Sequence, residues 1–387
     1  AQVARLREKY APKLTELQQQ AAGIETAEQR EARREAFQAA RDAGKQGREL
    51  QAAVDEAVQL SDEQQKKLAE LRQQQRSVTE EPRGELQGLL TTEQRAQLPQ
   101  RNRGAQGRGV RPTHANVKYG PHDRNVMDVW LAESAKPTPV LVSIHGGGFR
   151  GGNKSVAPEL LQACLESGIS VVAITYRLSD QAIAPAQFLD SARAIQYIRH
   201  QAKEWNLDPK RVASTGGSAG AGLSLWLGFH DDLAQPDSDD PVLRESTRLT
   251  CVSVYNGQTS YDPRFIRELF PDTDTYQHPA LAQLYDVDLS KLDDLPQEKY
   301  QLFEKVSALP HLTKDDVPAL LCYGSDLDTP IRNQGVGIHH PRFGKVLQEQ
   351  MQKLGIECQV VPRSSREDWA ERTVDFVKKH FGMAQNN

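Results

Sequence analysis

A short pattern of small residues near the middle of the chain constrains the fold more than any other feature. Residues 211–222 read RVASTGGSAGAG, and Ser218 lies between Gly216 and Gly220 in a G-x-S-x-G pattern. A run with β-strand character precedes the pattern, and a helix-like, leucine-containing segment follows it. A strand that turns directly into a helix holds the serine in a strained conformation, and only small neighbours let the strand and helix pass closely. The pattern therefore predicts a strand–turn–helix unit that presents one serine.

A second glycine-rich motif lies upstream of the first. The strand-like run 140–144 leads into residues 145–149, which read HGGGF. Glycine and serine also fill ordinary turns, so G-x-S-x-G alone is a weak signal. Both motifs in this order, each at the end of a predicted strand, indicate a nucleophile and an oxyanion hole. We predict Ser218 as the nucleophile and the backbone N–H groups of Gly147, Gly148 and Ala219 as the oxyanion hole.

On these two motifs the chain resembles the α/β-hydrolase superfamily, specifically esterases of the hormone-sensitive-lipase and carboxylesterase type. The resemblance covers about residues 114–387. It implies a mainly parallel sheet covered by helices on both faces, and hydrolysis of a small-molecule ester without a metal or organic cofactor. One position departs from the family: those esterases commonly carry an acidic residue just before the serine, and here that residue is Gly217.

Alternating strand-like and helix-like segments after residue 113 agree with a mainly parallel sheet. Between the strands expected at 250–255 and 319–323, residues 258–310 form an insertion that is rich in Phe and Tyr. Such aromatic density fits ordinary local core, and it also fits a lid over an apolar substrate pocket. Because lids in many members of the resembled family come from insertions, we predict a lid.

The resemblance also implies an acidic residue after the penultimate strand. That loop, residues 323–330, reads YGSDLDTP and contains two aspartates. We favour Asp328, because the D-x-P that it begins resembles the usual turn after the catalytic acid. Asp326 stays open as the alternative, and one of the two is expected only to stabilise the turn.

A base for the serine is harder to find. In the resembled family the histidine follows the last strand, but residues 361–369 contain no histidine. Either a histidine from another loop serves, or the chain is a hydrolase fold that has lost turnover. The best substitutes are His340 and His339, which precede a predicted helix and follow the acid loop. His311 and His230 are weaker candidates, and two solvent-facing histidines at a helix start are the alternative interpretation.

Residues 1–100 differ from the rest in being rich in Gln, Glu, Arg, Ala and Leu, which favours helix. Capping boxes beginning at Thr26, Ser61 and Thr91 predict three helix starts in a small all-α domain. Residues 60–64 and 90–94 resemble the L-T-x-x-Q motif of Spy-like periplasmic proteins, the first with serine for threonine. The alternative is a pair of well-capped surface helices. Either way this domain is a possible site for a protein partner, and no Cys or His precedes His114 to form a soft-metal site.

Residues 101–113 are basic and Gly-rich, which predicts a flexible linker to the hydrolase domain at 114–387. The net charge of −4 argues against a nucleic-acid partner, and no apolar run is long enough for a transmembrane segment. The chain begins Ala-Gln without a methionine, from which we expect a secreted or periplasmic protein after signal removal. The four cysteines predict neither a disulfide nor a metal site.

Together these features predict a serine hydrolase that cleaves carboxylic esters by acyl transfer to water. Two alternatives stay open: a binding protein of hydrolase fold that lacks the base, and an amide or peptide hydrolase that uses the same residues. Whether any histidine reaches Ser218 separates the first alternative from the enzyme.

Overall fold

The computed structural model describes residues 110–384 without a gap and, before them, only single residues and short runs between Lys13 and Leu71. The chain divides into two compact units, residues 1–106 and 107–387. The division falls inside the segment that we predicted as a linker.

The second unit is built on one eight-stranded sheet with the strand order β1-β2-β4-β3-β5-β6-β7-β8. β2 pairs antiparallel with β1 and β4, and all other neighbours are parallel, which confirms the predicted mainly parallel sheet. The strands are β1 (His114–Lys118), β2 (Val126–Trp130), β3 (Thr138–Ile144), β4 (Ser170–Ile174), β5 (Leu207–Gly217), β6 (Val252–Tyr255), β7 (Ala319–Cys322) and β8 (Cys358–Val361).

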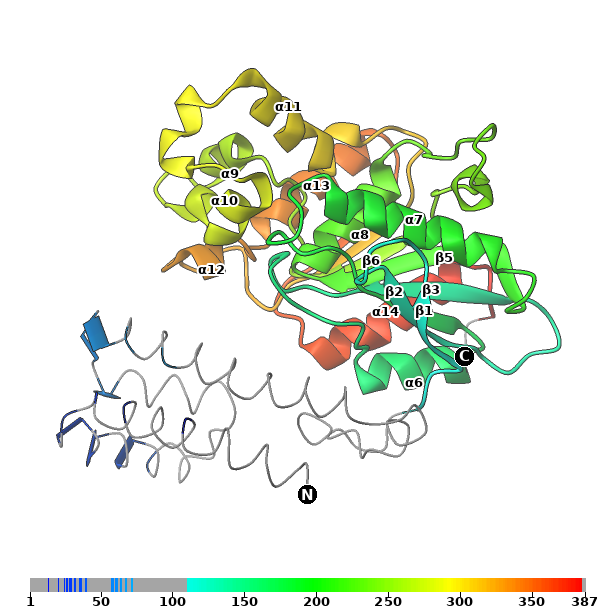
Figure 1. Ribbon diagram of the computed structural model, residues 1–387, viewed down its shortest axis with the longest axis horizontal. Helices are drawn as coiled ribbons and strands as arrows, with labels where there is room; N and C mark the ends of the chain where they lie inside the picture. Colours follow the sequence, from blue (N-terminus) through cyan, green and yellow to red (C-terminus); the bar gives the residue numbers. More distant parts are fainter. Residues whose placement is uncertain are drawn as a thin grey trace. The chain divides into compact units, whose positions relative to one another are not determined.

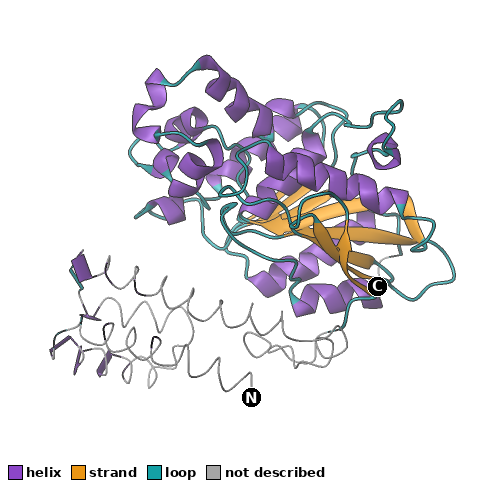
Figure 2. Cartoon of the chain, in the orientation of Figure 1, coloured by secondary structure: helices purple, strands orange, loops and turns teal. Residues whose placement is uncertain are grey.

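Helices cover both faces of this sheet, as Figure 2 shows. α7 (Ala186–His200), α8 (Ala219–Phe229) and α13 (Arg342–Lys353) share one hydrophobic core, whereas α6 (Pro158–Glu166) and α14 (Arg366–His380) share the other. Successive side chains of β3 alternate between them: Val140 and Val142 belong to the first core and Leu141 to the second. Strands buried on both faces explain the near-continuous apolar runs in the sequence.

The insertion between β6 and β7 is helical. α9 (Pro263–Leu269), α10 (Pro279–Tyr285) and α11 (Gln297–Val306) lie together at one side of the unit (Figure 1). Most of its aromatic side chains are core residues, since Phe270, Tyr285 and Phe303 are almost fully buried and Tyr285 packs edge-on against Phe303. Local packing therefore accounts for much of the aromatic density. The remaining elements between residues 110 and 384 are α12 (Gln334–Gly337) and four short 3₁₀ helices, Pro241–Arg244, Thr275–Gln277, Leu289–Asp294 and Leu309–His311.

Two of the expected capping boxes are formed in the first unit. The N–H of Gln29 donates to Thr26 Oγ1, and the N–H of Thr26 donates to the Gln29 side chain; Ser61 and Gln64 repeat this exchange. The third box, at Thr91, and most of the linker lie outside the described residues. None of the helices in the described part of the chain is long and apolar enough to cross a membrane.

Candidate active site

Ser218 lies at the sharp turn between β5, which ends at Gly217, and α8, which begins at Ala219. Its backbone has φ 54° and ψ −121°, in the strained region expected for this turn. A Cβ on Gly220 would lie 2.0 Å from the carbonyl oxygen of Ile144, and one on Gly216 would lie 2.5 Å from the same atom. Glycine is therefore required at both positions, because β3 passes the turn too closely for any side chain.

His339 is the histidine that the structure brings to Ser218. Its Nε2 lies 2.8 Å from Ser218 Oγ, within hydrogen-bond distance. Its Nδ1 lies 2.9 Å from the carbonyl oxygen of Gly335, one helical turn earlier in α12. A carbonyl can only accept, so Nδ1 carries the proton and Nε2 is left free to accept one from the serine. Burial lowers the pKa of His339 below its ordinary value of 6.5, which keeps the ring neutral near pH 7.

The structure does not bring His340, the other candidate base, into contact with Ser218. Its side chain is fully buried. Its Nε2 lies 3.2 Å from the carbonyl oxygen of Thr329, its Nδ1 accepts from the N–H of Arg342, and its ring packs edge-on against Phe270. The two histidines are consecutive in the turn between α12 and α13, and their side chains point in different directions, so only His339 faces the serine.

His230 and His311 are also outside the site. Their rings lie 4.5 Å apart, and His230 caps the C-terminal end of α8, whereas Ser218 lies at the N-terminal end of that helix. The two ends of α8 are therefore much too far apart for a hydrogen bond between His230 and Ser218.

The expected carboxylate partner of the histidine is likewise not brought into place. Asp328 is exposed, and Asp326 pairs with Arg363 in the loop after β8. Within residues 110–384, no carboxylate oxygen lies within 4.0 Å of a ring nitrogen of His339. The backbone carbonyl of Gly335 occupies the position that an acidic side chain was predicted to fill.

The HGGGF loop has an unusual backbone at three consecutive positions. Gly147, Gly148 and Phe149 have φ of 104°, 59° and 60°, and a Cβ on Gly147 would lie 2.3 Å from the carbonyl oxygen of Gly151. The buried Phe149 anchors the loop, because its carbonyl accepts from both the N–H and the hydroxyl of Ser179. In the continuous part that the structure describes, the N–H groups of Gly147, Gly148 and Ala219 donate to no other protein group.

His145 supports this loop from behind. Its ring stacks on Tyr176 at 4.3 Å, Nδ1 lies 2.8 Å from the carbonyl oxygen of Gly146, and Nε2 lies 3.2 Å from Arg124 Nη2. Burial lowers the pKa of His145 to about 4, so the ring is neutral and accepts from the guanidinium. His145 therefore fixes the shape of the loop and is not placed to take a proton from Ser218.

These groups meet in one cavity of about 220 Å³. The insertion forms part of its wall, since Tyr261, His278, Ala280 and Leu281 lie between β6 and β7 in the sequence. The complete lining is Gly147, Gly148, Phe149, Arg150, Ser218, Ala219, Gln258, Tyr261, His278, Ala280, Leu281, Ile338 and His339. Among the described residues, no group of three or more His, Cys, Asp or Glu side chains is arranged to hold a metal ion.

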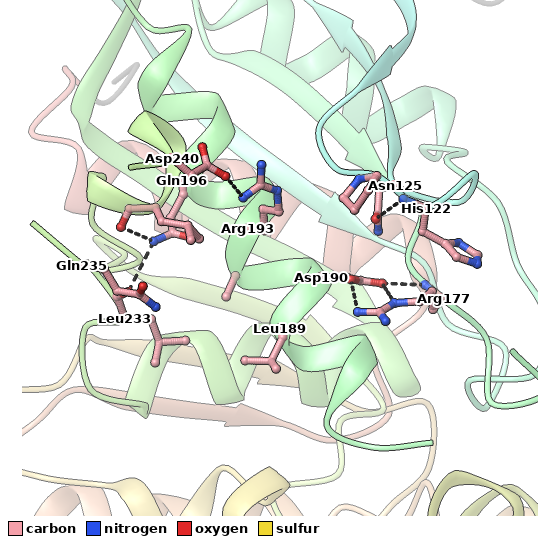
Figure 3. A pocket seen from close by; sticks show the side chains of 13 residues that line it. His122, Asn125, Arg177, Leu189, Asp190, Arg193, Gln196, Leu233, Gln235 and Asp240 are labelled. Atoms are coloured by element: carbon pink, nitrogen blue, oxygen red, sulfur yellow. Dashed lines mark hydrogen bonds and ion pairs between the residues drawn. The ribbon is translucent and has the colours of Figure 1, made fainter. Parts of the chain in front are cut away.

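A larger cavity of about 910 Å³ lies against α7 and contains neither Ser218 nor His339 (Figure 3). Its charged side chains are already paired with one another: Arg177 with Asp190 and Arg193 with Asp240, both at 2.7 Å. The amide of Gln196 donates to backbone carbonyls. Its polar groups stabilise the fold around α7, so the smaller cavity at Ser218 is the better candidate active site.

The strand order, the turn at Ser218 and its contact with His339 define the class of this protein as an α/β-hydrolase fold. Within that class the chain belongs to the BD-FAE family, which matches residues 127–334, more than half of its length. The matched segment includes Ser218 and the HGGGF loop and ends before His339.

Curated relatives support this placement. The chain is 33% identical over 135 residues to "Esterase LipQ" and 32% identical over 148 residues to "Probable carboxylic ester hydrolase LipM", both of Mycobacterium tuberculosis. These alignments cover 34% and 36% of this chain, but only 30% and 34% of the two relatives. The chain thus matches about a third of the length of these relatives.

Solved structures agree on the fold. A "Truncated form of carbohydrate esterase from gut microbiota" is 22% identical with a TM-score of 0.53, over 69% of this chain and 95% of that chain. An acetyl ester-xyloside bifunctional hydrolase from Caldicellulosiruptor lactoaceticus is 19% identical with a TM-score of 0.53, over 67% of this chain and 89% of that chain.

Proposed function

We propose that the chain is a serine esterase that hydrolyses carboxylic esters through an acyl-enzyme. The observation that carries this proposal is the 2.8 Å contact between Ser218 Oγ and His339 Nε2, in a cavity that also holds unused backbone N–H groups. A serine hydroxyl becomes a useful nucleophile only when a neighbouring base takes its proton. The names of the curated relatives, an esterase and a probable carboxylic ester hydrolase, favour an ester as the substrate.

In the first half of the reaction, Ser218 Oγ attacks the ester carbonyl carbon while its proton moves to His339 Nε2. The carbonyl oxygen becomes an oxyanion, which the N–H groups of Gly147, Gly148 and Ala219 would bind. When the intermediate collapses, the C–O bond to the alcohol breaks, and the alcohol leaves with the proton from His339. Water then attacks the acyl-enzyme in the same way, giving the acid and restoring Ser218.

Gly335 takes over one of the two tasks that an acidic residue performs in a serine triad. Its carbonyl accepts the Nδ1 proton and so keeps His339 in the tautomer that can accept at Nε2. A neutral carbonyl stabilises the imidazolium less than a carboxylate does, because it carries only a partial charge. We therefore propose a Ser–His pair held by a backbone carbonyl. The absence of a carboxylate at His339 Nδ1, within residues 110–384, is the observation that supports the alternative of a weakly active, binding-type hydrolase.

The cavity also limits the substrate. A volume of about 220 Å³ is below the range that drug-sized ligands occupy. We therefore infer that the acyl group is short, and that a larger alcohol portion would extend out of the cavity.

A phosphonate probe and a chromogenic ester test the proposal. Ser218 should become covalently labelled, as located by peptide mass analysis, and Ser218→Ala should abolish both labelling and hydrolysis of 4-nitrophenyl acetate. Ser325→Ala is a matched control, because that serine lies in the loop after β7 and does not line the cavity at Ser218. Labelling of another serine, or hydrolysis that persists in Ser218→Ala, would overturn the proposal.

A further inference from the structure

Arg150 brings an unpaired positive charge to the catalytic cavity. It directly follows the HGGGF loop, is exposed, and lines the cavity beside Ser218. Its Nε lies 3.9 Å from the position that a Cβ on Gly148 would occupy, so the side chain lies over the oxyanion loop. Across residues 110–384, no carboxylate oxygen lies within 4.0 Å of its guanidinium. Arg177 and Arg193 of the larger cavity, in contrast, are each paired with an aspartate.

His278 adds a second unused donor from a different element. It is the N-cap of α10, and its Nδ1 accepts from the N–H of Ala280 at 3.2 Å. A ring that accepts at Nδ1 and is neutral carries its proton on Nε2. Burial lowers the pKa of His278, and the charge of Arg150 lowers it further, so the neutral form prevails near pH 7. In the part of the chain described here, Nε2 of His278 has no hydrogen-bond partner.

No side chain in the rest of the cavity lining neutralises the positive charge of Arg150. None of the lining residues is acidic, and the other polar side chains are those of Ser218, His339, Gln258 and Tyr261. The amide of Gln258 is already used, since Nε2 donates to the carbonyls of Asn256 and Ile338. An anionic ligand would therefore meet donors from two different elements and no acidic side chain in the cavity lining.

We propose that the preferred substrates are esters that carry a carboxylate close to the scissile bond, bound by the Arg150 guanidinium and the Nε2–H of His278. This inference rests on the proposed esterase function and names the substrate class of the same site. An arginine fork matches the geometry of a carboxylate, and charge-assisted hydrogen bonds are about twice as strong as neutral ones. A positive cavity also raises the rate at which anionic substrates are captured at low salt.

Two matched ester pairs test this, with hydrolysis followed in a pH-stat near pH 7. Monomethyl and dimethyl succinate differ by a charge on the acyl side; 4-acetoxybenzoate and its methyl ester differ by a charge on the alcohol side. We expect kcat/KM to favour the anionic member of at least one pair. Arg150→Gln should lower that anionic-to-neutral ratio about tenfold, as expected for loss of one partly exposed charge-assisted contact. His278→Asn keeps an N-cap acceptor for α10, removes the imidazole donor and should lower the ratio less.

Lys203→Gln is the matched control for charge. Lys203 is exposed and precedes β5, so it lies at the amino edge of the strands, away from Ser218. This variant should leave the ratio unchanged. The inference is overturned if neither pair favours its anionic member, or if Arg150→Gln slows both members equally, which would make Arg150 a support for the oxyanion. Ser218-dependent hydrolysis of the neutral esters would still stand in both cases. Failure to hydrolyse any of the four esters would reject the esterase function itself, and this inference with it.

Discussion

Separate alanine variants of the neighbouring His339 and His340 should change different properties: His339→Ala should lower activity, and His340→Ala should lower stability. His339 Nε2 is 2.8 Å from Ser218 Oγ, so His339→Ala removes the proposed base. General-base catalysis contributes about 10²–10⁴-fold, and we expect kcat/KM to fall by that factor. Because the pair acts as a unit, adding Ser218→Ala to this variant should cost little more.

His340→Ala should instead destabilise the fold. The side chain is fully buried, accepts from the N–H of Arg342 and packs against Phe270. Its loss leaves the N–H of Arg342 without a partner and opens a cavity beside the ring of Phe270. Together these should lower the free energy of unfolding by about 2–4 kcal/mol. The folded fraction of this variant should keep kcat/KM within roughly threefold of the wild type, since His340 does not touch the nucleophile.

Both variants should be measured for hydrolysis of 4-nitrophenyl acetate and for urea unfolding in the same buffer. Wild type and Ser218→Ala set the upper and lower limits of activity. His339 is not the base if His340→Ala, while folded, drops to the activity of Ser218→Ala and His339→Ala stays active. If both variants keep full activity, neither histidine is the base, and the Ser–His pair must be abandoned.

Three further outcomes follow from the geometry. Burial holds the pKa of His339 below 6.5, and only its neutral form is a base, so kcat/KM should be full near pH 8 and fall only below pH 6.5; an acid limb centred above pH 7 would contradict this assignment. Gly220→Ala should lower the free energy of unfolding by about 2–3 kcal/mol or prevent folding, whereas Gly217→Ala, whose nearest neighbour is 3.7 Å away, should be close to neutral in urea unfolding. A chain that begins at Gly107 should fold and keep its esterase activity, since it retains the carbonyl that Trp130 Nε1 binds; an insoluble product would show that the N-terminal unit is needed.

The turn at Ser218 and the HGGGF loop could be predicted because the close backbone contacts and positive φ values that they require leave a pattern of glycines in the sequence. Glycines at 216 and 220 are required by the carbonyl of Ile144, and the three positive φ values of the HGGGF loop favour the glycines found at 147 and 148. The central strands β3, β4, β6 and β7 could be predicted because each is a short apolar run that is almost fully buried.

The sequence limits the proposed base to a few histidines, but it does not identify which histidine faces Ser218 or which group that histidine contacts at Nδ1. His339 and His340 share the same neighbours along the chain, and only the path of residues 323–341 decides which ring faces the serine. The ion pair between Asp326 and Arg363 joins two loops that are far apart in sequence, and no sequence pattern predicts it. A backbone acceptor such as the Gly335 carbonyl has no residue signature at all, because every residue carries one.

The aromatic content of residues 258–310 likewise could not distinguish a local core from a lid over the cavity. Phe303 and Tyr285 are core residues, whereas Tyr261 is both buried and part of the cavity wall. Its hydroxyl contacts the Ala219 carbonyl and Gln258 Oε1, so one aromatic side chain packs the core and links the serine turn to the insertion. Composition cannot separate these roles, since both require a large apolar ring in the same segment.

The loops after β7 and β8 show why the histidine can come from elsewhere without loss of the scaffold. In the resembled esterases these loops carry the acid and the base; here they carry Asp326 and Arg363, which pair with each other. The Arg363 side chain is 74% exposed, so this ion pair adds little stability. Backbone hydrogen bonds hold the loops together instead: the N–H of Arg363 donates to the carbonyl of Ser325, and that of Ser364 donates to the carbonyl of Tyr323. Because neither bond depends on a side chain, replacing the usual histidine leaves the edge of the sheet intact. The turn between α12 and α13 instead carries His339, the proposed base, with the carbonyl of Gly335 rather than a carboxylate at its Nδ1.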